Sequence, residues 1–247
     1  MMQRSRWMPA WYVTLKDIRT YYLKPPLISW GMLFPIVLIL AFFLRDPGDI
    51  RSAIPGLVGM TVLFGATSVE AVAITFEKRI GAMERLLMAP LSPWALVAAK
   101  ALSGALFGLG TGLLTCALGC IVWRLSFSPY VLIVLALGSI AFALLGVVLS
   151  LLMREVFDAM TLTNFFRFPM VFLSGTFVPL GDMALWLRVV ACCLPLTYTV
   201  DGVRYCMLGA GHAHFALVVD LLAIALFSVA LFAAALALFR HRLEDML

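Results

Sequence analysis

Charge is scarce in this sequence. Only 13% of its 247 residues are charged, whereas 64% are hydrophobic and the mean hydropathy is +1.06. Soluble domains carry roughly 25% charged and 45–50% apolar residues. Water penalises a large apolar surface and lipid does not, so the composition excludes an ordinary soluble domain and predicts an integral membrane protein.

Catalytic motifs are also missing. The sequence contains no G-x-x-x-x-G-K-[ST] phosphate loop and no H-E-x-x-H zinc motif. His212 and His214 fall outside the apolar runs, and nothing places either beside Ser174 as a serine protease would need. With Cys206 these histidines could form an external metal site, but a polar loop tip is the preferred interpretation. We therefore expect no catalytic, metal or cofactor-binding residue on this chain.

The net charge of +5 does not indicate a nucleic-acid partner, because the basic residues are scattered between apolar runs. Lysine and arginine beside membrane spans instead set orientation. The predicted inner segments carry more than twice as many of them as the predicted outer segments. Both termini are therefore expected in the cytoplasm.

Six apolar runs are long enough to cross the hydrocarbon core, which takes roughly 20 helical residues. Helices are expected because unpaired strand backbone is not tolerated in lipid. The predicted fold is an all-α integral membrane protein with a cytoplasmic N-terminus (1–26), a six-span domain (27–239) and a cytoplasmic tail (240–247). The spans are predicted at 27–44, 53–76, 101–122, 130–153, 159–178 and 216–239.

Apolar residues recur at helical spacing before the first run and predict an amphipathic helix lying in the membrane interface. Lys16, Asp17 and Thr20 fall on its polar face. Pro25 and Pro26 end it. The apolar face consists of Trp11, Leu15, Ile18 and Tyr22.

A short charged helix is predicted at 78–90, between the second and third runs. Ile80, Met83 and Leu87 share one face, Glu84 lies off it, and Pro90 ends it. From these residues alone, the segment is either a solvated connector or a docking element. At 179–211, Arg188 and Pro195 interrupt an apolar stretch, which predicts an external re-entrant helical hairpin instead of a seventh span.

Two features lie inside the spans. Gly104, Gly108 and Gly112 form small-xxx-small steps that favour helix packing within or between subunits. Glu70 and Arg167 lie at matched depth, about two turns from the cytoplasmic side. They either form an ion pair or stay solvated because their helices project into the cytosol, and solvation is preferred.

Three groups of residues recur together in one family. The first is Glu77…Gly81…Glu84-Arg-Leu-Leu-Met-Ala-Pro-Leu-Ser92, followed by Lys100. The second is Phe157-Asp158 with Leu173-Ser-Gly-Thr-Phe-Val-Pro179. The third is Trp186-Leu-Arg188, Leu194-Pro-Leu-Thr-Tyr198, Asp201-Gly-Val-Arg204 and Gly209. In these groups and in its six spans, nearly the whole chain resembles type-2 ABC exporter permeases, such as the daunorubicin and polysaccharide exporter permeases.

The resemblance implies roles for these segments. The 78–90 helix would couple to a separate ABC ATPase through Glu77, Arg79, Ile80, Gly81, Met83, Glu84, Leu87 and Pro90. The re-entrant hairpin would include Pro179, Trp186, Arg188, Pro195, Tyr198, Asp201 and Arg204.

It also implies partners and a location. Two ATPase copies would hold ATP and Mg, and a second copy of this permease or a close paralogue would complete the pathway. Lipids would surround the assembly in the cytoplasmic (inner) membrane of a bacterium or archaeon. Two alternatives stay open. One is a self-sufficient secondary transporter or channel, for which inverted repeats and several intramembrane carboxylates would be expected. The other is a non-transporting membrane assembly factor.

Overall fold

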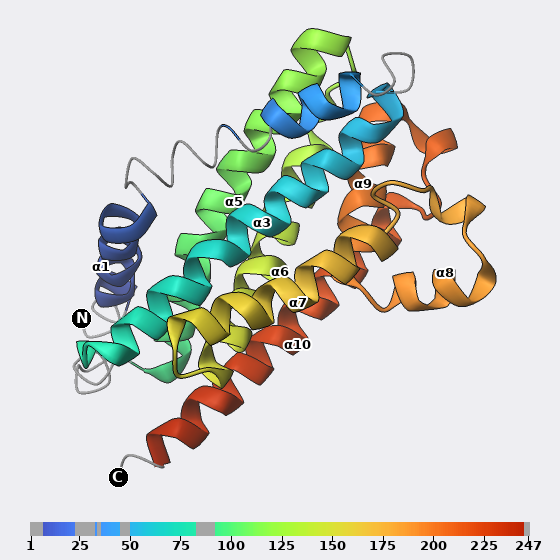
Figure 1. Cartoon of the computed structure of the whole chain (residues 1–247). Coiled ribbons are helices and arrows are strands. Elements are labelled where there is room, and N and C mark those ends of the chain that lie inside the picture. The colour runs from blue at the N-terminus through green and yellow to red at the C-terminus, as the bar shows by residue number, and fades with distance from the viewer. Residues whose placement is uncertain (1–6, 23–32, 34–35, 45–49, 83–91, 245–247) are drawn as a thin grey trace.

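The computed structural model describes residues 7–22, 33, 36–44, 50–82 and 92–244, and over these residues the chain is helical without strands (Figure 1). The main helices are α1 (Trp7–Asp17), α3 (Ile50–Arg79), α5 (Pro93–Trp123), α6 (Tyr130–Leu152), α7 (Val156–Leu173), α8 (Leu185–Cys192), α9 (Pro195–Leu208) and α10 (Leu217–Glu244). Short turns of other helix types are η1 (Ile18–Tyr22), η2 (Leu180–Asp182) and η3 (Ala210–His212).

Helix α3 is the centre of the bundle. It contacts α5, α6, α7 and α9, and α10 covers α6 and α9 from the other side. The residues that α3 buries are mostly small or β-branched, including Val58, Val62 and Ala66. Such side chains let neighbouring helix backbones approach closely, so the core is built by close helix packing.

The long helices alternate in direction, so the bundle has two distinct ends (Figure 1). Helix α1, the end of α3, the start of α5 and the end of α10 lie together at one end, which we call the terminal end. Helices α8 and α9 lie at the other, the hairpin end. Both described ends of the chain therefore lie on the same side of the bundle.

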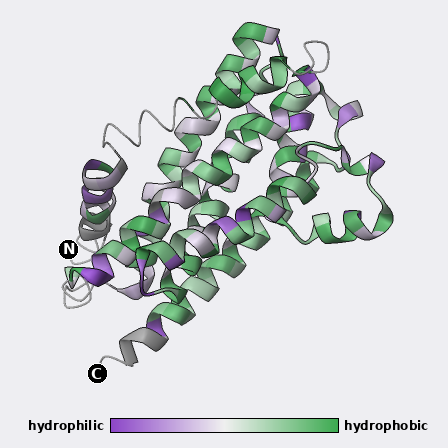
Figure 2. Cartoon of the chain, in the orientation of Figure 1, coloured by the Kyte–Doolittle hydropathy of each residue, from purple (hydrophilic) through white to green (hydrophobic). Residues whose placement is uncertain are grey.

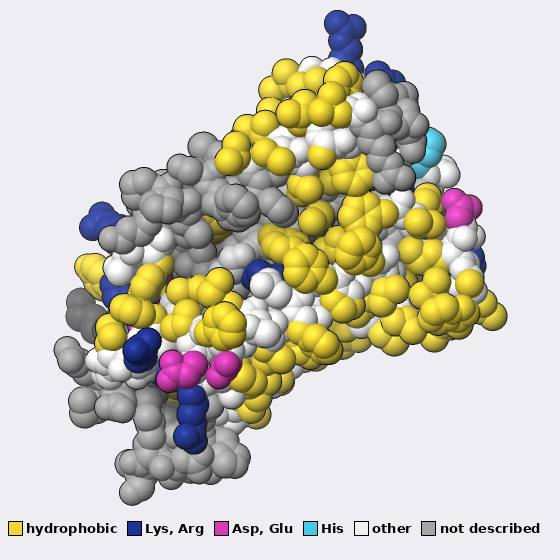
Figure 3. Space-filling view, in the orientation of Figure 1, with side chains coloured by type: hydrophobic (Ala, Val, Ile, Leu, Met, Phe, Trp, Pro, Cys, Tyr) yellow, Lys and Arg dark blue, Asp and Glu magenta, His cyan; other side chains and the backbone are white. Residues whose placement is uncertain are grey.

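The surface of the bundle is apolar along its length. Figure 2 shows hydrophobic residues along the helices, and Figure 3 shows hydrophobic side chains over the middle of one face with most charges toward the ends. Four described helices are long and apolar enough to cross a membrane: Ile50–Arg79, Pro93–Trp123, Tyr130–Leu152 and Leu217–Arg240. Several crossings of the membrane follow from these lengths and compositions.

The other two predicted spans are not among these four helices. Helix α7 is not among those four, and its 18 residues include Asp158, Asn164 and Arg167. Of the first predicted run, the structure describes residue 33 and residues 36–44, all helical, and the rest lies outside the described residues. The count of six spans therefore stays a prediction.

Two of the helix boundaries that differ from the predicted spans have clear structural causes. Helix α5 begins at Pro93, a residue favoured in the first helical turn, eight residues before the predicted span start at Ala101. The predicted span stops short of Lys100, which is charged but buried and paired inside the bundle. Helix α7 ends at Leu173, before the predicted end at Val178. Gly175 adopts a left-handed φ of 77° just after it, a conformation that commonly terminates helices.

Candidate functional site

Four charged side chains meet at the terminal end of the bundle, where α1, α3 and α5 come together. Lys100 Nζ lies 2.5 Å from Glu77 Oε2 and 2.7 Å from Asp17 Oδ2. Lys16 Nζ lies 2.5 Å from Glu77 Oε1 and 2.9 Å from Asp17 Oδ1. Each carboxylate thus lies between the same two ammonium groups, and the formal charge of this four-residue cluster is zero.

The cluster is buried except at Lys16. Asp17 and Glu77 are each 1% exposed and Lys100 is 2% exposed, whereas about two fifths of the Lys16 side chain is accessible. Removing these charges from water is costly unless each finds a partner. The alternating arrangement provides those partners, so the cluster stays intact only while all three helices are in place.

Helix α1 reaches the cluster through its inner face. Val13 and Thr14 are buried, and the Thr14 hydroxyl donates a hydrogen bond of 3.0 Å to the Ala99 carbonyl of α5. Trp11 is instead 54% exposed. The prediction that Asp17 lies on a polar face is wrong, because its carboxylate turns inward to pair with Lys100 of α5.

The pKa values near the cluster follow from this burial. Burial lowers the pKa of the Lys16 ammonium, but its hydrogen bond to Glu77 and the charge of Asp17 together outweigh burial and raise it. Burial and the nearby Glu77 carboxylate raise the pKa of Tyr21 to about 12. Lys16 therefore remains charged and Tyr21 neutral at physiological pH.

Lys78, the residue after Glu77, connects α3 to α6. Its Nζ donates hydrogen bonds to the carbonyls of Ser150 at 2.7 Å, Met153 at 3.1 Å and Leu151 at 3.2 Å. These carbonyls belong to the last turn of α6 and the residue after it, where a cation is electrostatically favourable. The last turn of α3 thus holds α1 and α5 through Glu77 and α6 through Lys78.

The predicted coupling residues separate into three groups. Glu77 lies in the interior, where it pairs with Lys16 and Lys100. Arg79 and Ile80 are exposed, and Gly81 ends α3 with a left-handed φ of 67°. The predicted helix therefore does not begin at residue 78, which still belongs to α3. Met83, Glu84, Leu87 and Pro90 lie outside the described residues.

Glu70 and Arg167 are both buried, so the preferred interpretation that they are solvated is wrong. Glu70 accepts a hydrogen bond of 2.8 Å from the Ser103 hydroxyl. Arg167 donates to the Thr67 hydroxyl at 2.5 Å and to Asn164 Oδ1 at 3.2 Å. Its guanidinium carbon also lies 5.1 Å from the centroid of the Phe64 ring, within cation–π range. The hydrogen bonds of the two charges thus go to different partners.

The glycine stripe packs within the chain. A Cβ on Gly108 would lie 2.6 Å from the Ala66 Cβ, and one on Gly104 would lie 2.8 Å from the Ala66 carbonyl oxygen. A Cβ on Gly112 would collide with the Val62 side chain. All three glycines face α3, so of the two open interpretations the structure supports packing between helices of one subunit.

The predicted re-entrant residues surround a helical hairpin made of α8 and α9. Arg188 donates to the carbonyls of Leu180 at 3.0 Å and Gly181 at 2.8 Å, and Tyr198 donates to the Cys192 carbonyl at 2.8 Å. Pro195 begins α9. Pro179 precedes η2, and Trp186 is 68% exposed on α8.

The second half of the hairpin is fixed by two charged residues. Asp201 accepts the backbone N–H groups of His214 at 2.9 Å and Phe215 at 2.7 Å, and Arg204 donates to the Gly175 carbonyl at 2.8 Å. The hairpin is therefore tied to both the segment before it and the segment after it.

Sequence reasoning did not identify the four-residue cluster. It singled out Glu77 and noted Lys100, but it left Lys16 and Asp17 on a polar face. The available signal was a balance of charge, since two acids and two bases flank the same end of the predicted spans. The spacing of apolar residues does not reveal such a cluster, because a paired charge and a solvated charge look the same in a helical pattern.

Long apolar helices, an apolar surface and charges gathered at the two ends define a multi-pass α-helical membrane protein. The comparison with known families then identifies the protein family. Residues 10–208 match the family described as the ABC-2 type transporter, and the chain belongs to this family. It is therefore the transmembrane permease of an ABC transporter, and the resemblance stated from the sequence is confirmed.

Several curated proteins are similar to this chain. The chain is 29% identical to nodulation protein J of Rhizobium leguminosarum bv. viciae over 194 residues, which make up 76% of this chain and 73% of the relative. It is 33% identical to nodulation protein J of R. leguminosarum bv. trifolii over 169 residues (68% and 62%). It is 25% identical to the inner membrane transport permease YadH of Escherichia coli K12 over 158 residues (63% and 62%).

Proposed function

We propose that this permease works as a pair in the cytoplasmic membrane, with both termini in the cytoplasm and two ABC ATPase subunits bound to its terminal end. Each copy would cross the membrane six times. The ATPase subunits would bind ATP and Mg and perform the hydrolysis, while the permease pair forms the pathway. Outward transport is proposed from the resemblance to exporter permeases.

The observation that carries this proposal is the buried cluster of Lys16, Asp17, Glu77 and Lys100. It lies where α3 ends and α5 begins, on both sides of the segment 78–90 that we assign to ATPase docking. A force applied to that segment reaches Glu77 and Lys100 within one or two helical turns on either side. Because these residues are paired with Asp17 and Lys16, α1 moves with them.

The same connection extends to α6. Lys78 holds the end of α6, so a displacement of the last turn of α3 is shared by four helices. Packed interfaces respond to such displacements by switching between discrete arrangements instead of deforming continuously. The terminal end is thus suited to convert a local push by the ATPase into movement of the whole bundle.

Docking itself would use the apolar residues of the segment. An amphipathic helix seated in a groove presents anchors at i, i+3 and i+7, here Ile80, Met83 and Leu87. Ile80 is 51% exposed, as an anchor without its partner would be. Glu84 would meet a basic rim of the groove.

The test changes the docking segment and measures ATPase binding. We expect Leu87→Asp to weaken co-purification of the ATPase at least about 30-fold, since an unpaired buried carboxylate at an interface costs roughly 2–5 kcal/mol. Glu84→Lys should weaken it as well, by reversing a rim charge. Both variants should stay monodisperse in detergent, because neither residue lies in a predicted span.

Asp182→Lys is the matched control, since it makes the same charge reversal at the hairpin end and should leave ATPase binding unchanged. If Leu87→Asp and Glu84→Lys both bind the ATPase normally and support transport, the segment is only a connector and the coupling role is wrong.

A further inference from the structure

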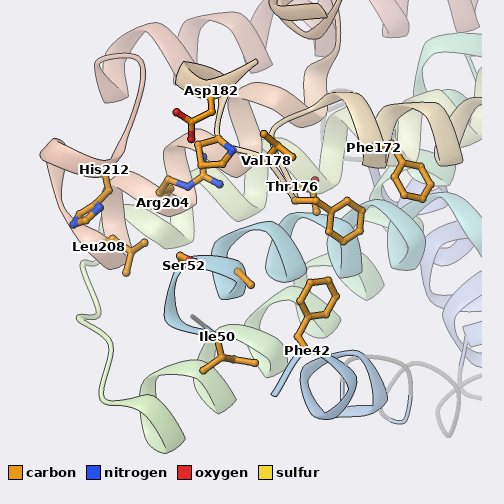
Figure 4. Close-up of a pocket in the computed structure, with 13 residues that line it drawn as sticks. Phe42, Ile50, Ser52, Phe172, Thr176, Val178, Asp182, Arg204, Leu208 and His212 are labelled. Carbon is orange, nitrogen blue, oxygen red and sulfur yellow. The ribbon is translucent and has the colours of Figure 1, made fainter. Parts of the chain in front are cut away.

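A cavity of about 790 Å³ lies at the hairpin end of the bundle, away from the four-residue cluster. Its walls come from the start of α3, the end of α7, the segment between α7 and α8, and α9. Figure 4 shows Asp182, Arg204 and His212 toward one side of the cavity and Phe42 and Phe172 toward the other. The cavity therefore has a polar side and an aromatic side.

The wall formed by Thr176 and its neighbours is held rigidly. A Cβ on Gly56 of α3 would collide with the Thr176 carbonyl, so the two backbones touch there. Arg204 Nη2 donates to the Gly175 carbonyl at 2.8 Å. Arg188 fixes the continuation of the wall through the Leu180 and Gly181 carbonyls. The cavity thus has a preformed shape, as small-molecule sites generally do.

Arg204 offers hydrogen-bond donors to the cavity. Of its five N–H groups, one is used by Gly175, and the ion pair with Asp201 is long, at 4.0 Å. Asp201 already accepts the backbone N–H groups of His214 and Phe215, which satisfy much of its capacity. The guanidinium thus retains charge and donors for an anionic group, a role for which its planar geometry is suited.

The aromatic side of the cavity suits an apolar chain. The Phe42 and Phe177 rings stack with centroids 5.6 Å apart, and Phe172 lies 5.4 Å from Phe177. Phe177 and Val178 are also partly exposed at the apolar surface of the bundle. An acyl chain could therefore extend from the surrounding lipid into the cavity without crossing polar surface.

We propose that this cavity binds a zwitterionic phospholipid, with its phosphate on Arg204 and its ammonium on Asp182. Asp182 is exposed and lines the same side of the cavity as Arg204, so the two protein charges match the two headgroup charges. The volume lies within the roughly 300–1,000 Å³ of typical ligand sites, enough for a headgroup and part of one chain. This inference does not depend on ATPase coupling.

The test uses the purified permease alone in detergent. The probe is a phosphatidylethanolamine carrying a diazirine on one acyl chain, and the covalent adduct is quantified by intact mass after photolysis. Unlabelled phosphatidylethanolamine should compete at least about 10-fold better than phosphatidylglycerol of the same chain length, because Asp182 favours an ammonium and repels an added anion. Asp182→Asn should remove that preference.

The decisive variant is Asp182→Asn, which keeps the side-chain size and removes only the negative charge. It should also lower the apparent affinity for phosphatidylethanolamine about 2- to 5-fold, the value of one exposed ion pair, without lowering thermal stability. Asp158→Asn is the matched control, because Asp158 is likewise exposed but does not line the cavity. Equal competition by the two lipids, or an Asp182→Asn protein that labels like the wild type, would overturn the proposal.

Discussion

At the scale of single residues, Lys100 is the residue on which the terminal end depends. Its ammonium balances Asp17 and Glu77, and the only other cation in the cluster, Lys16, is partly exposed. Replacing Lys100 by methionine keeps most of the side-chain volume and leaves two buried carboxylates with one lysine. Breaking a buried ion pair in this way costs about 3–5 kcal/mol. We expect Lys100→Met to lower the thermal unfolding midpoint markedly in detergent.

A double variant separates the effect of the lost charge on stability from the effect of changed packing. Adding Glu77→Gln to Lys100→Met removes one excess carboxylate and leaves the Lys16–Asp17 pair, so part of the lost stability should return. A double variant as unstable as the sum of the two single variants would mean that the four charges act independently.

At the scale of helices, the packing of α5 on α3 depends on particular glycines. A Cβ on Gly108 would lie 2.9 Å from the Ala66 backbone nitrogen and 3.0 Å from its Cα, atoms that move only with α3 itself. We expect Gly108→Ala to destabilise the protein and raise the fraction that aggregates in detergent. The measurement is the unfolding midpoint together with the monodisperse yield.

Gly110 provides the comparison two residues away. A Cβ there would meet nothing within 4 Å, so Gly110→Ala should be neutral or stabilising by up to about 1 kcal/mol through helix propensity. Equal effects of the two substitutions would show that the close approach of α3 and α5 does not matter for stability.

The same helices show how far sequence reasoning extends. Apolar runs predicted helices at the positions of α3, α5, α6 and α10, because hydrophobic length is a strong signal for membrane spans. The predicted span in α5 starts too late, because Lys100 is hydrophilic and its buried partners Asp17 and Glu77 lie far away along the chain. Asp17 was misassigned for the same reason. Pairing between distant charges is a tertiary property that a local pattern does not contain.

At the scale of the whole molecule, both described ends of the chain lie at one end of the bundle, opposite α8 and α9 (Figure 1). With cytoplasmic termini, Arg79 should face the cytoplasm and Asp182 the outside. Both side chains are exposed, so each accepts a cysteine without disturbing the core. In a background without the five native cysteines, Asp182→Cys should react with an impermeant maleimide in intact cells and Arg79→Cys only after lysis. Labelling in the reverse order would invert the proposed topology.

The four-residue cluster also fixes an order of events during synthesis. Asp17 leaves the ribosome early, but Lys100 follows roughly 80 residues later, a delay of about 4–17 s at ordinary elongation rates. Until then the Asp17 carboxylate has no buried ammonium to meet, so α1 must wait in water or at the lipid headgroups. Its docking is thus a late step in biogenesis, after α3 and the start of α5 are inserted. A ribosome-bound chain arrested before Lys100 emerges should leave α1 open to protease, and a longer arrested chain should protect it.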